Sequence, residues 1–229
     1  MEQIVKNTVK AENQVRKTEY VTFERKSGKG IRVLFVGNSI TFHGEKPDIG
    51  WNRSCGMAAS SKEKDYVHLL ITCILEKNPE AAFCICQAAE WERHYKEGGD
   101  ILPLYEQARD FQADIIIMRV IENCSTEAFD TGAFEKEYER LIDFLADRRQ
   151  AQLILTTGFW HHIGDDVIRR LAVRRGFPLV ELGDLGEDEQ MKAIGLYEHS
   201  GVANHPGDLG MREVANRIYD KIKLFCSIT

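Results

Sequence analysis

The chain has 229 residues and a formal net charge of −6, with acidic and basic residues interspersed along its length. This length suits one domain with a sizeable core. The sequence contains no basic patch of the kind that binds nucleic acid and no apolar run long enough to cross a bilayer. The first residues, MEQIVKNTVKAENQ, lack an apolar signal core, so we expect a cytoplasmic protein without nucleic-acid or membrane partners.

The first part of the chain differs in character from the rest. Residues 1–30 are mostly polar and predict an N-terminal arm packed on the body, with a short strand near Tyr20–Phe23. Residues 31–229 predict a single domain, because strand and helix patterns follow one another there without a linker or a repeat.

From residue 31 onward, apolar segments alternate with amphipathic ones. Continuous apolar strands separated by helices indicate a parallel sheet that is covered on both faces. We therefore expect an α/β fold, a three-layer α/β/α sandwich around a central parallel sheet of about five strands. The strands are predicted at 31–36, 81–87, 114–121, 152–157 and 179–182, and helices at 65–77, 102–111, 134–148 and 165–175. A last helix is predicted to start near Asp208 and to run through Val214, Ile218, Ile222 and Phe225.

The segment after the first strand, FVGNSIT at residues 35–41, is the most informative one in the chain. It predicts a tight turn that carries Ser39 at the carboxyl end of a buried strand, where open α/β sheets place their ligands. Gly37 allows the sharp turn, and the hydroxyl and amide of Ser39 can then point into one space. The alternative is that Ser39 only caps a helix.

A histidine near the C-terminus makes a catalytic interpretation stronger. The segment ANHPGDLGM at residues 203–211 precedes an apolar stripe at helical spacing. Pro206 keeps His205 out of the helical region, so His205 is predicted in a loop from which it can reach the sheet edge. Histidine is the side chain best suited to proton transfer near neutral pH, although a lone loop histidine can also be structural.

A third segment, IIIMRVIEN at residues 115–123, is a predicted buried strand that ends in Asn123. Together these segments resemble the SGNH (GDSL-like) hydrolase family. The family has a G-[DN]-S motif after its first strand, an asparagine after a central strand and an H-P-x-[DN]-x-G segment before its last helix. This sequence matches with GNS at residues 37–39, with Asn123, and with HPGDLG at residues 205–210.

The resemblance implies a flavodoxin-like catalytic domain at residues 31–229 and a role for each matching residue. Ser39 would be the nucleophile and His205 its general base. The amide of Ser39, the amide of Ala89 after the second strand and the side chain of Asn123 would form the oxyanion hole. The resemblance implies no metal and no organic cofactor.

The sequence departs from the family three residues before the histidine. The family usually has an aspartate there, whereas this chain has Val202. Something else must accept the Nδ1 proton of His205 and hold its tautomer. A main-chain carbonyl near Val202 could do this, and so could a carboxylate; Asp208 is also a natural N-cap for the last helix. The carboxylates we considered are Glu122, Glu90, Glu198 and Asp208.

Aromatic and polar side chains near the predicted carboxyl edge of the sheet are candidates for substrate binding. The loop at residues 43–61 could form a wall of the site, with Trp51 against a sugar ring. A buried loop anchor is the alternative for this tryptophan. The substrate-binding candidates are Asn38, Trp51, Trp91, Trp160 and His161.

The six cysteines do not suggest a disulfide framework. Cys84 and Cys86 are two positions apart on a predicted strand and therefore share a face, as small core residues would. No Cys-x-x-Cys pair occurs, and the pair His161–His162 has no third ligand at a suitable spacing. We predict no metal site.

These observations predict a serine esterase for a small-molecule ester with a short acyl group, such as an O-acetylated carbohydrate or another small polar substrate. A Ser-His dyad or a non-standard triad would carry the reaction. One alternative is a thioesterase or lysophospholipase-like acylhydrolase. Another is a carbohydrate-binding protein that has lost catalysis, which the missing aspartate motivates. The oligomeric state is not predicted.

Overall fold

The computed structural model describes residues 20–25, 29–147 and 150–227. They form a six-stranded sheet with the order β1-β3-β2-β4-β5-β6. All neighbouring strands are parallel except β1, which runs antiparallel to β3 at one edge. The strands are β1 (Val21–Arg25), β2 (Arg32–Gly37), β3 (Ala82–Gln87), β4 (Ile115–Arg119), β5 (Gln152–Thr156) and β6 (Leu179–Val180).

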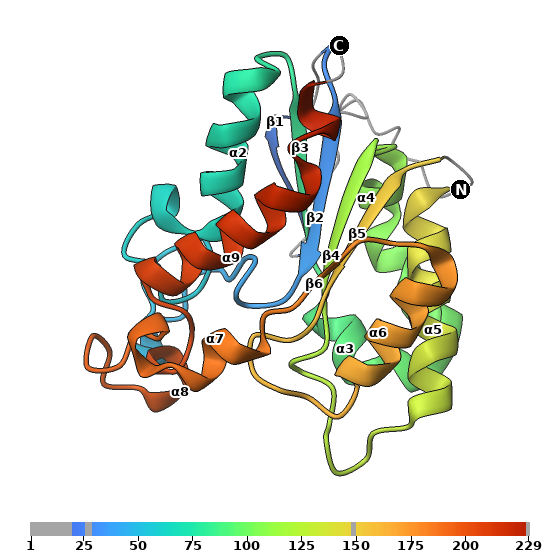
Figure 1. The fold of residues 1–229 in the computed structure, drawn as a ribbon. Helices are drawn as coiled ribbons and strands as arrows, with labels where there is room; N and C mark the ends of the chain where they lie inside the picture. Colours follow the sequence, from blue (N-terminus) through green and yellow to red (C-terminus); the bar gives the residue numbers. More distant parts are fainter. Residues whose placement is uncertain (1–19, 26–28, 148–149, 228–229) are drawn as a thin grey trace, which may run out of the picture.

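Helices cover both faces of this sheet, so the predicted three-layer α/β/α sandwich is confirmed (Figure 1). On one face lie α2 (Tyr66–Lys77) and α9 (Asp208–Ile222), which pack against each other. The other face is covered by α3 (Ala89–His94), α4 (Glu106–Asp110), α5 (Thr131–Ala146) and α6 (Asp165–Arg175). Shorter helices are α7 (Gly183–Glu187) and α8 (Ser200–Ala203), with 3-10 turns at Pro47–Ile49, Lys62–Lys64, Tyr95–Tyr105, Glu189–Met191 and Phe225–Ser227.

Alternating side chains of the strands build two separate cores. Val33 and Phe35 of β2 pack toward α2 and α9, whereas Leu34 and Val36 pack toward the opposite helices. This alternation follows from the two-residue period of a strand, and it explains why the strands read as continuous apolar runs. Cys84 and Cys86 share one face of β3, as the sequence predicted.

The order of the strands also fixes where a site can form. Strand β2 lies between β3 and β4: the connection after β2 runs through α2 to β3 on one side, and the connection after β3 crosses the other face of the sheet to β4 on the opposite side. In open α/β sheets this switch point leaves a crevice that binds ligands. The segment that carries Ser39 starts at this point, directly after Gly37.

The edge strand β1 is held by an ionic cluster as well as by the sheet. His68 of α2 contacts Asp65 through Nδ1 at 2.7 Å and Glu24 of β1 through Nε2 at 3.5 Å. Burial opposes a charge on this imidazole, but its bonds with Asp65 and Glu24 outweigh burial and raise the pKa of His68 to about 9. Asp65 also caps α2 and accepts a bond from the Gly56 amide, so the cluster fixes the loop before α2 too.

The structure differs from the sequence prediction in a few elements. Helix α3 was not predicted, because it has only six residues, between the end of β3 and the 3-10 turn at Tyr95–Tyr105. The helix predicted at 102–111 is α-helical only at Glu106–Asp110, since Pro103 cannot donate a backbone bond. The N-terminal arm predicted at 1–30 includes the sheet strand β1, and residues 1–19 and 26–28 lie outside the described residues.

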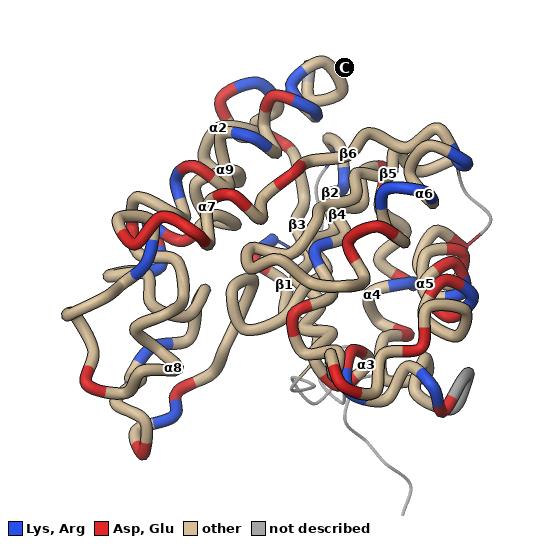
Figure 2. The backbone as a smooth tube through the Cα atoms, turned by 60° about the horizontal axis from the view of Figure 1, so that its bottom comes forward, with Lys and Arg blue, Asp and Glu red and all other residues tan. Residues whose placement is uncertain are grey.

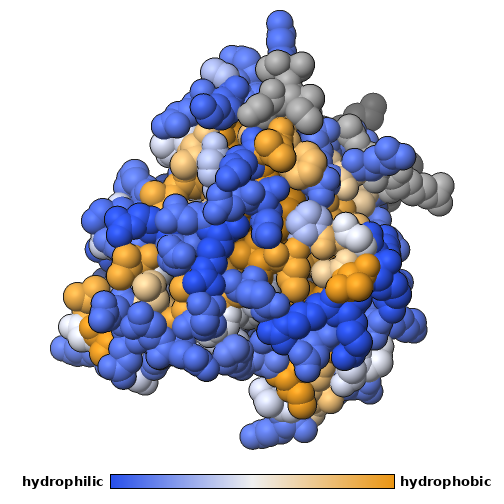
Figure 3. Space-filling model, in the orientation of Figure 1, coloured by the Kyte–Doolittle hydropathy of each residue, from blue (hydrophilic) through white to orange (hydrophobic). Residues whose placement is uncertain are grey.

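The surface is polar and carries charges of both signs. Acidic and basic segments are interspersed on the helices (Figure 2), and Arg174 and Arg175 of α6 pair with acidic side chains of α5. In the orientation of Figure 3, hydrophilic side chains surround scattered apolar ones. None of the helices in the described residues is long and apolar enough to span a bilayer.

Candidate active site

Ser39 lies in a tight turn whose geometry requires glycine two positions earlier. A Cβ atom on Gly37 would lie 2.0 Å from Oγ1 of Thr41 and 2.8 Å from the carbonyl oxygen of Arg119. The turn is closed by bonds from the Thr41 and Phe42 amides to the Asn38 carbonyl, each 2.9 Å long. The amide of Ser39 has no acceptor among the described residues, so it is available to a ligand.

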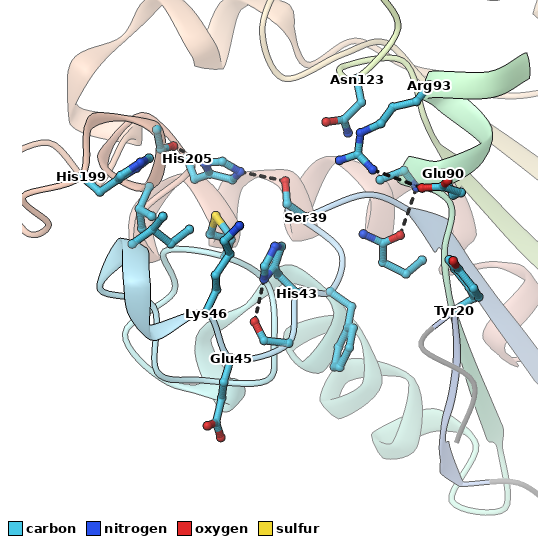
Figure 4. A pocket seen from close by; sticks show the side chains of 18 residues that line it. Tyr20, Ser39, His43, Glu45, Lys46, Glu90, Arg93, Asn123, His199 and His205 are labelled. Carbon is cyan, nitrogen blue, oxygen red and sulfur yellow. Dashed lines mark hydrogen bonds and ion pairs between the residues drawn. The ribbon is translucent and has the colours of Figure 1, made fainter. Parts of the chain in front are cut away.

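His205 lies against this serine although 166 positions separate the two residues in the chain. Its Nε2 is 2.8 Å from Oγ of Ser39, and its Nδ1 is 2.6 Å from the carbonyl oxygen of Gly201 in α8 (Figure 4). The bond to a carbonyl requires a proton on Nδ1, so Nε2 is left to accept the serine proton. Trp160 packs edge-on against the imidazole at a centroid distance of 5.4 Å.

Burial lowers the pKa of His205 to about 4, and the charge of Arg119 contributes, whereas the bond to the Gly201 carbonyl acts in the opposite direction. The imidazole is therefore neutral near pH 7. A neutral imidazole with a free Nε2 lone pair can accept a proton, which a protonated one cannot.

Ser39 and His205 open into a cavity of about 670 Å³. Figure 4 shows the two side chains facing each other, with Asn123, Arg93 and Glu90 on one side and Lys46 and His199 on the other. The cavity is lined by Tyr20, Ser39, Phe42, His43, Gly44, Glu45, Lys46, Ile49, Met57, Gln87, Ala89, Glu90, Arg93, Asn123, His199, Gly201, Val202 and His205.

Three of these residues were predicted to form an oxyanion hole, and the structure brings all three, Ser39, Ala89 and Asn123, to the same cavity. The amide of Ala89, however, already donates to the side-chain oxygen of Gln87 at 3.1 Å. A ligand oxygen can reach this amide only if the Gln87 side chain turns away.

Beneath the cavity lies a buried polar network that the sequence did not predict. Asn38 donates to Glu92 at 2.9 Å and to Glu122, and its oxygen accepts a bond from Arg119. Arg119 also forms an ion pair with Glu122. Asn123 donates from Nδ2 to Glu92. The side chain of Asn38 is thus used inside the protein and is 1% exposed, which corrects its prediction as a substrate-binding residue.

None of the four carboxylates considered as partners of His205 accepts its Nδ1 proton. Glu122 is engaged with Arg119 and accepts a bond from the Phe159 amide at 3.0 Å. Glu90 lines the cavity but pairs with Arg93 and His94. Their prediction as orienting groups is therefore corrected, because the Gly201 carbonyl takes the Nδ1 proton.

The last two carboxylates of that set are also placed by the structure. Glu198 is exposed at the surface. Asp208 accepts bonds from the amide and hydroxyl of Ser60 at 2.8 and 2.7 Å and pairs with Lys64. It lies in the first turn of α9, and Gly207 occupies the N-cap position predicted for it.

The aromatic candidates for substrate binding do not line the cavity either. Trp51 and Trp91 are 0% and 1% exposed, so they are packing residues and cannot stack on a ligand. Trp91 packs against Tyr95 and against the rings of Phe134 and Tyr138 in α5. Trp160 supports His205, and His161 pairs with Glu187 at 3.1 Å outside the cavity. The loop at 43–61 does form a wall, as predicted, through its first residues and Met57.

Sequence reasoning missed the cavity residues Gln87, Arg93, Lys46, His43 and His199. Their charges and lengths are ordinary for surface residues, and only their place near the predicted serine and histidine loops could have singled them out. The six cysteines are free thiols. No group of three or more His, Cys, Asp or Glu among the described residues is arranged to hold a metal ion.

No protein-family model matches the chain, and no curated protein is significantly similar to it. Solved structures are similar in fold. A two-domain esterase active on acetylated mannans aligns with a TM-score of 0.55 at 17% identity over 88% of this chain and 52% of its own. The present chain thus spans about half the length of that esterase.

Two further solved structures also have a similar fold. A family two carbohydrate esterase from Cellvibrio japonicus aligns with a TM-score of 0.56 at 14% identity, covering 87% of this chain and 62% of its own. The psychrotrophic esterase EstA from Pseudoalteromonas sp. aligns with a TM-score of 0.55 at 12% identity, covering 86% and 99%. The chain therefore has the fold of the SGNH (GDSL-like) hydrolases, as its motifs predicted.

Proposed function

We propose that this protein is a serine esterase that cleaves short-acyl carboxylic esters by a Ser-His dyad. The observation that carries the proposal is the chain of contacts from Ser39 through His205 to the Gly201 carbonyl, at the mouth of a cavity. A nucleophile, a base and a group that orients the base are the elements that ester hydrolysis requires. Such a dyad needs no aspartate at the position of Val202, because the Gly201 carbonyl orients His205.

The reaction follows from the geometry. His205 takes the Ser39 proton on Nε2 while Oγ attacks the acyl carbon. The negative charge that develops on the acyl oxygen is stabilised by the Ser39 amide, by Asn123 and, once Gln87 has moved, by the Ala89 amide. The imidazolium then protonates the leaving alkoxide, and a water molecule hydrolyses the acyl-enzyme by the same steps.

The cavity favours a polar substrate. Charged side chains of both signs, Lys46, Glu45, Arg93 and Glu90, lie around it, beside apolar side chains such as Phe42, Ile49 and Met57. Hydroxyl-rich molecules find many hydrogen-bonding partners in such a site. Since two structures of similar fold are described as esterases of acetylated mannan or carbohydrate, an O-acetylated carbohydrate is the substrate class we propose.

Replacement of the nucleophile tests the proposal. Ser39→Ala should reduce ester hydrolysis by about 10³-fold or more at unchanged melting temperature, because only binding and the oxyanion hole remain. Labelling with a fluorophosphonate should mark the wild type and fail in this variant. A variant that keeps more than about a tenth of the wild-type rate would contradict the proposal, and a chain that binds acetylated sugars without cleaving them would support the binding-protein alternative.

A further inference from the structure

Glu92 of α3 is a glutamate with no exposed surface, located between the turn that carries Ser39 and the segment that carries Asn123. One carboxylate oxygen accepts bonds from Nδ2 of Asn38 and from the amide of Ile121. The other accepts a bond from Nδ2 of Asn123. Every partner is a donor, which is the pattern that suits an ionised carboxylate.

This arrangement determines which end of the Asn123 amide faces which neighbour. If the amide turned by half a revolution, its oxygen would face a carboxylate oxygen, and two acceptors would meet without a proton between them. Glu92 thus selects the orientation in which Nδ2 lies next to it. Nδ2 carries two hydrogens, so one is taken by Glu92 and the other is left for a group in the cavity that Asn123 lines.

An ionised carboxylate at this buried position lowers the stability of the folded state. Burial first, and then the charge of nearby Glu122, raise the pKa of Glu92 to about 7. Arg119 is the cation of the cluster, and it pairs with Glu122. If Glu92 served only to fill space, an uncharged side chain of similar volume would serve at lower cost. The retained charge is therefore better explained by what it orients.

We propose that Glu92 is a positioning residue for the oxyanion hole, whose carboxylate holds the Asn123 amide with its nitrogen toward the acyl oxygen. This inference rests on the proposed esterase function. Glu92 does not touch the substrate, and it acts only through Asn123. Because Glu92 also binds Asn38 and Ile121, it joins the serine turn, α3 and the Asn123 segment at one point.

A double-mutant cycle tests this role, measured near pH 8 so that Glu92 is mainly ionised. Asn123→Ala should lower kcat by about 10²–10³-fold. Glu92→Gln should lower kcat by about 10–100-fold with KM changed by less than about threefold, since Gln offers one acceptor in place of two. In the Asn123→Ala background, Glu92→Gln should lower kcat by less than about threefold further.

The matched control is Glu137→Gln on α5, another nearly buried glutamate that lies outside the cavity and pairs with Lys136 and Arg140. It should leave kcat unchanged. If Glu92→Gln does not fold, Glu92→Asp enters the same cycle, because it keeps the charge but shortens the reach. Losses that multiply in the double variant, or a Glu92 effect confined to KM, would overturn the positioning role. Activity that survives Ser39→Ala would instead refute the esterase proposal itself.

Discussion

The bond between Gln87 and the Ala89 amide allows a test of the oxyanion hole in which activity should rise. In the structure the side-chain oxygen of Gln87 accepts a hydrogen bond of 3.1 Å from the Ala89 amide. An acyl oxygen would have to bind to this same amide. Gln87→Met keeps the length of the side chain but removes this competing acceptor. Gln87→Glu keeps the acceptor and gives it a negative charge beside the position of the oxyanion.

The magnitude follows from the strength of the bond that must break. A neutral hydrogen bond contributes about 0.5–1.5 kcal/mol net, so its loss in Gln87→Met should raise kcat/KM by about 2- to 13-fold. A bond to a charged acceptor contributes about 1.5–3 kcal/mol, which is about 1–1.5 kcal/mol more than the neutral bond of the wild type, so Gln87→Glu should lower kcat/KM by about 5- to 13-fold relative to wild type.

The assay is acetate ester hydrolysis at saturating and limiting substrate, with the released alcohol quantified by chromatography. Melting temperatures of both variants provide the control for folding. The reasoning requires opposite signs for the two variants. Equal activity in wild type and both variants, or a loss in Gln87→Met, would refute the participation of the Ala89 amide.

The remaining predictions concern the group that orients His205, the acyl length of the substrate and the contribution of His68 to stability. Glu90→Gln, Glu198→Gln and Asp208→Asn should each retain far more activity than His205→Ala, and one that matches His205→Ala in kcat would reject the dyad. Across a series of acyl esters, kcat/KM should peak between acetyl and butyryl and fall by octanoyl, because each methylene gains about 0.8 kcal/mol only against an apolar wall; a steady rise would favour a lipid substrate. His68 has a pKa of about 9 in the folded protein and an ordinary pKa of 6.5. The stability that protonated His68 gives the fold is therefore fully present below pH 6.5 and is lost as the pH rises through 9. The melting temperature should therefore fall over this range, and a fall of the same size in His68→Gln would contradict the assignment.

The sequence predicted the sheet well because each buried strand is a local pattern. The residues at the carboxyl ends of those strands, Ser39 and Asn123, then had to meet at one edge of the sheet. The loop position of His205 was also local information, set by Pro206. These inferences needed no knowledge of distant contacts.

The parts that escaped prediction depend on tertiary contacts. A main-chain carbonyl near Val202 was one of the predicted partners of His205, and Gly201 supplies it. The sequence could not choose it over a carboxylate, because every residue has a backbone carbonyl. Glu92 resembles any glutamate of a polar segment, and only the fold shows that it is buried beside Asn38. Trp51 and Trp91 were ambiguous because an aromatic side chain near a loop serves a core and a binding site equally well.

The antiparallel strand β1 has a practical consequence for anyone who shortens this protein. A fragment that starts at residue 31 matches the boundary suggested by the hydrophobic pattern. It would lack β1, however, and β3 would then be an unpaired edge strand. The uncovered backbone amides and carbonyls of β3 would then offer a template for intermolecular pairing and precipitation. The same cut would remove Tyr20 from the cavity wall and Glu24 from His68. Expression of an insoluble or impaired fragment would therefore report on a missing sheet edge and not on the chemistry of Ser39.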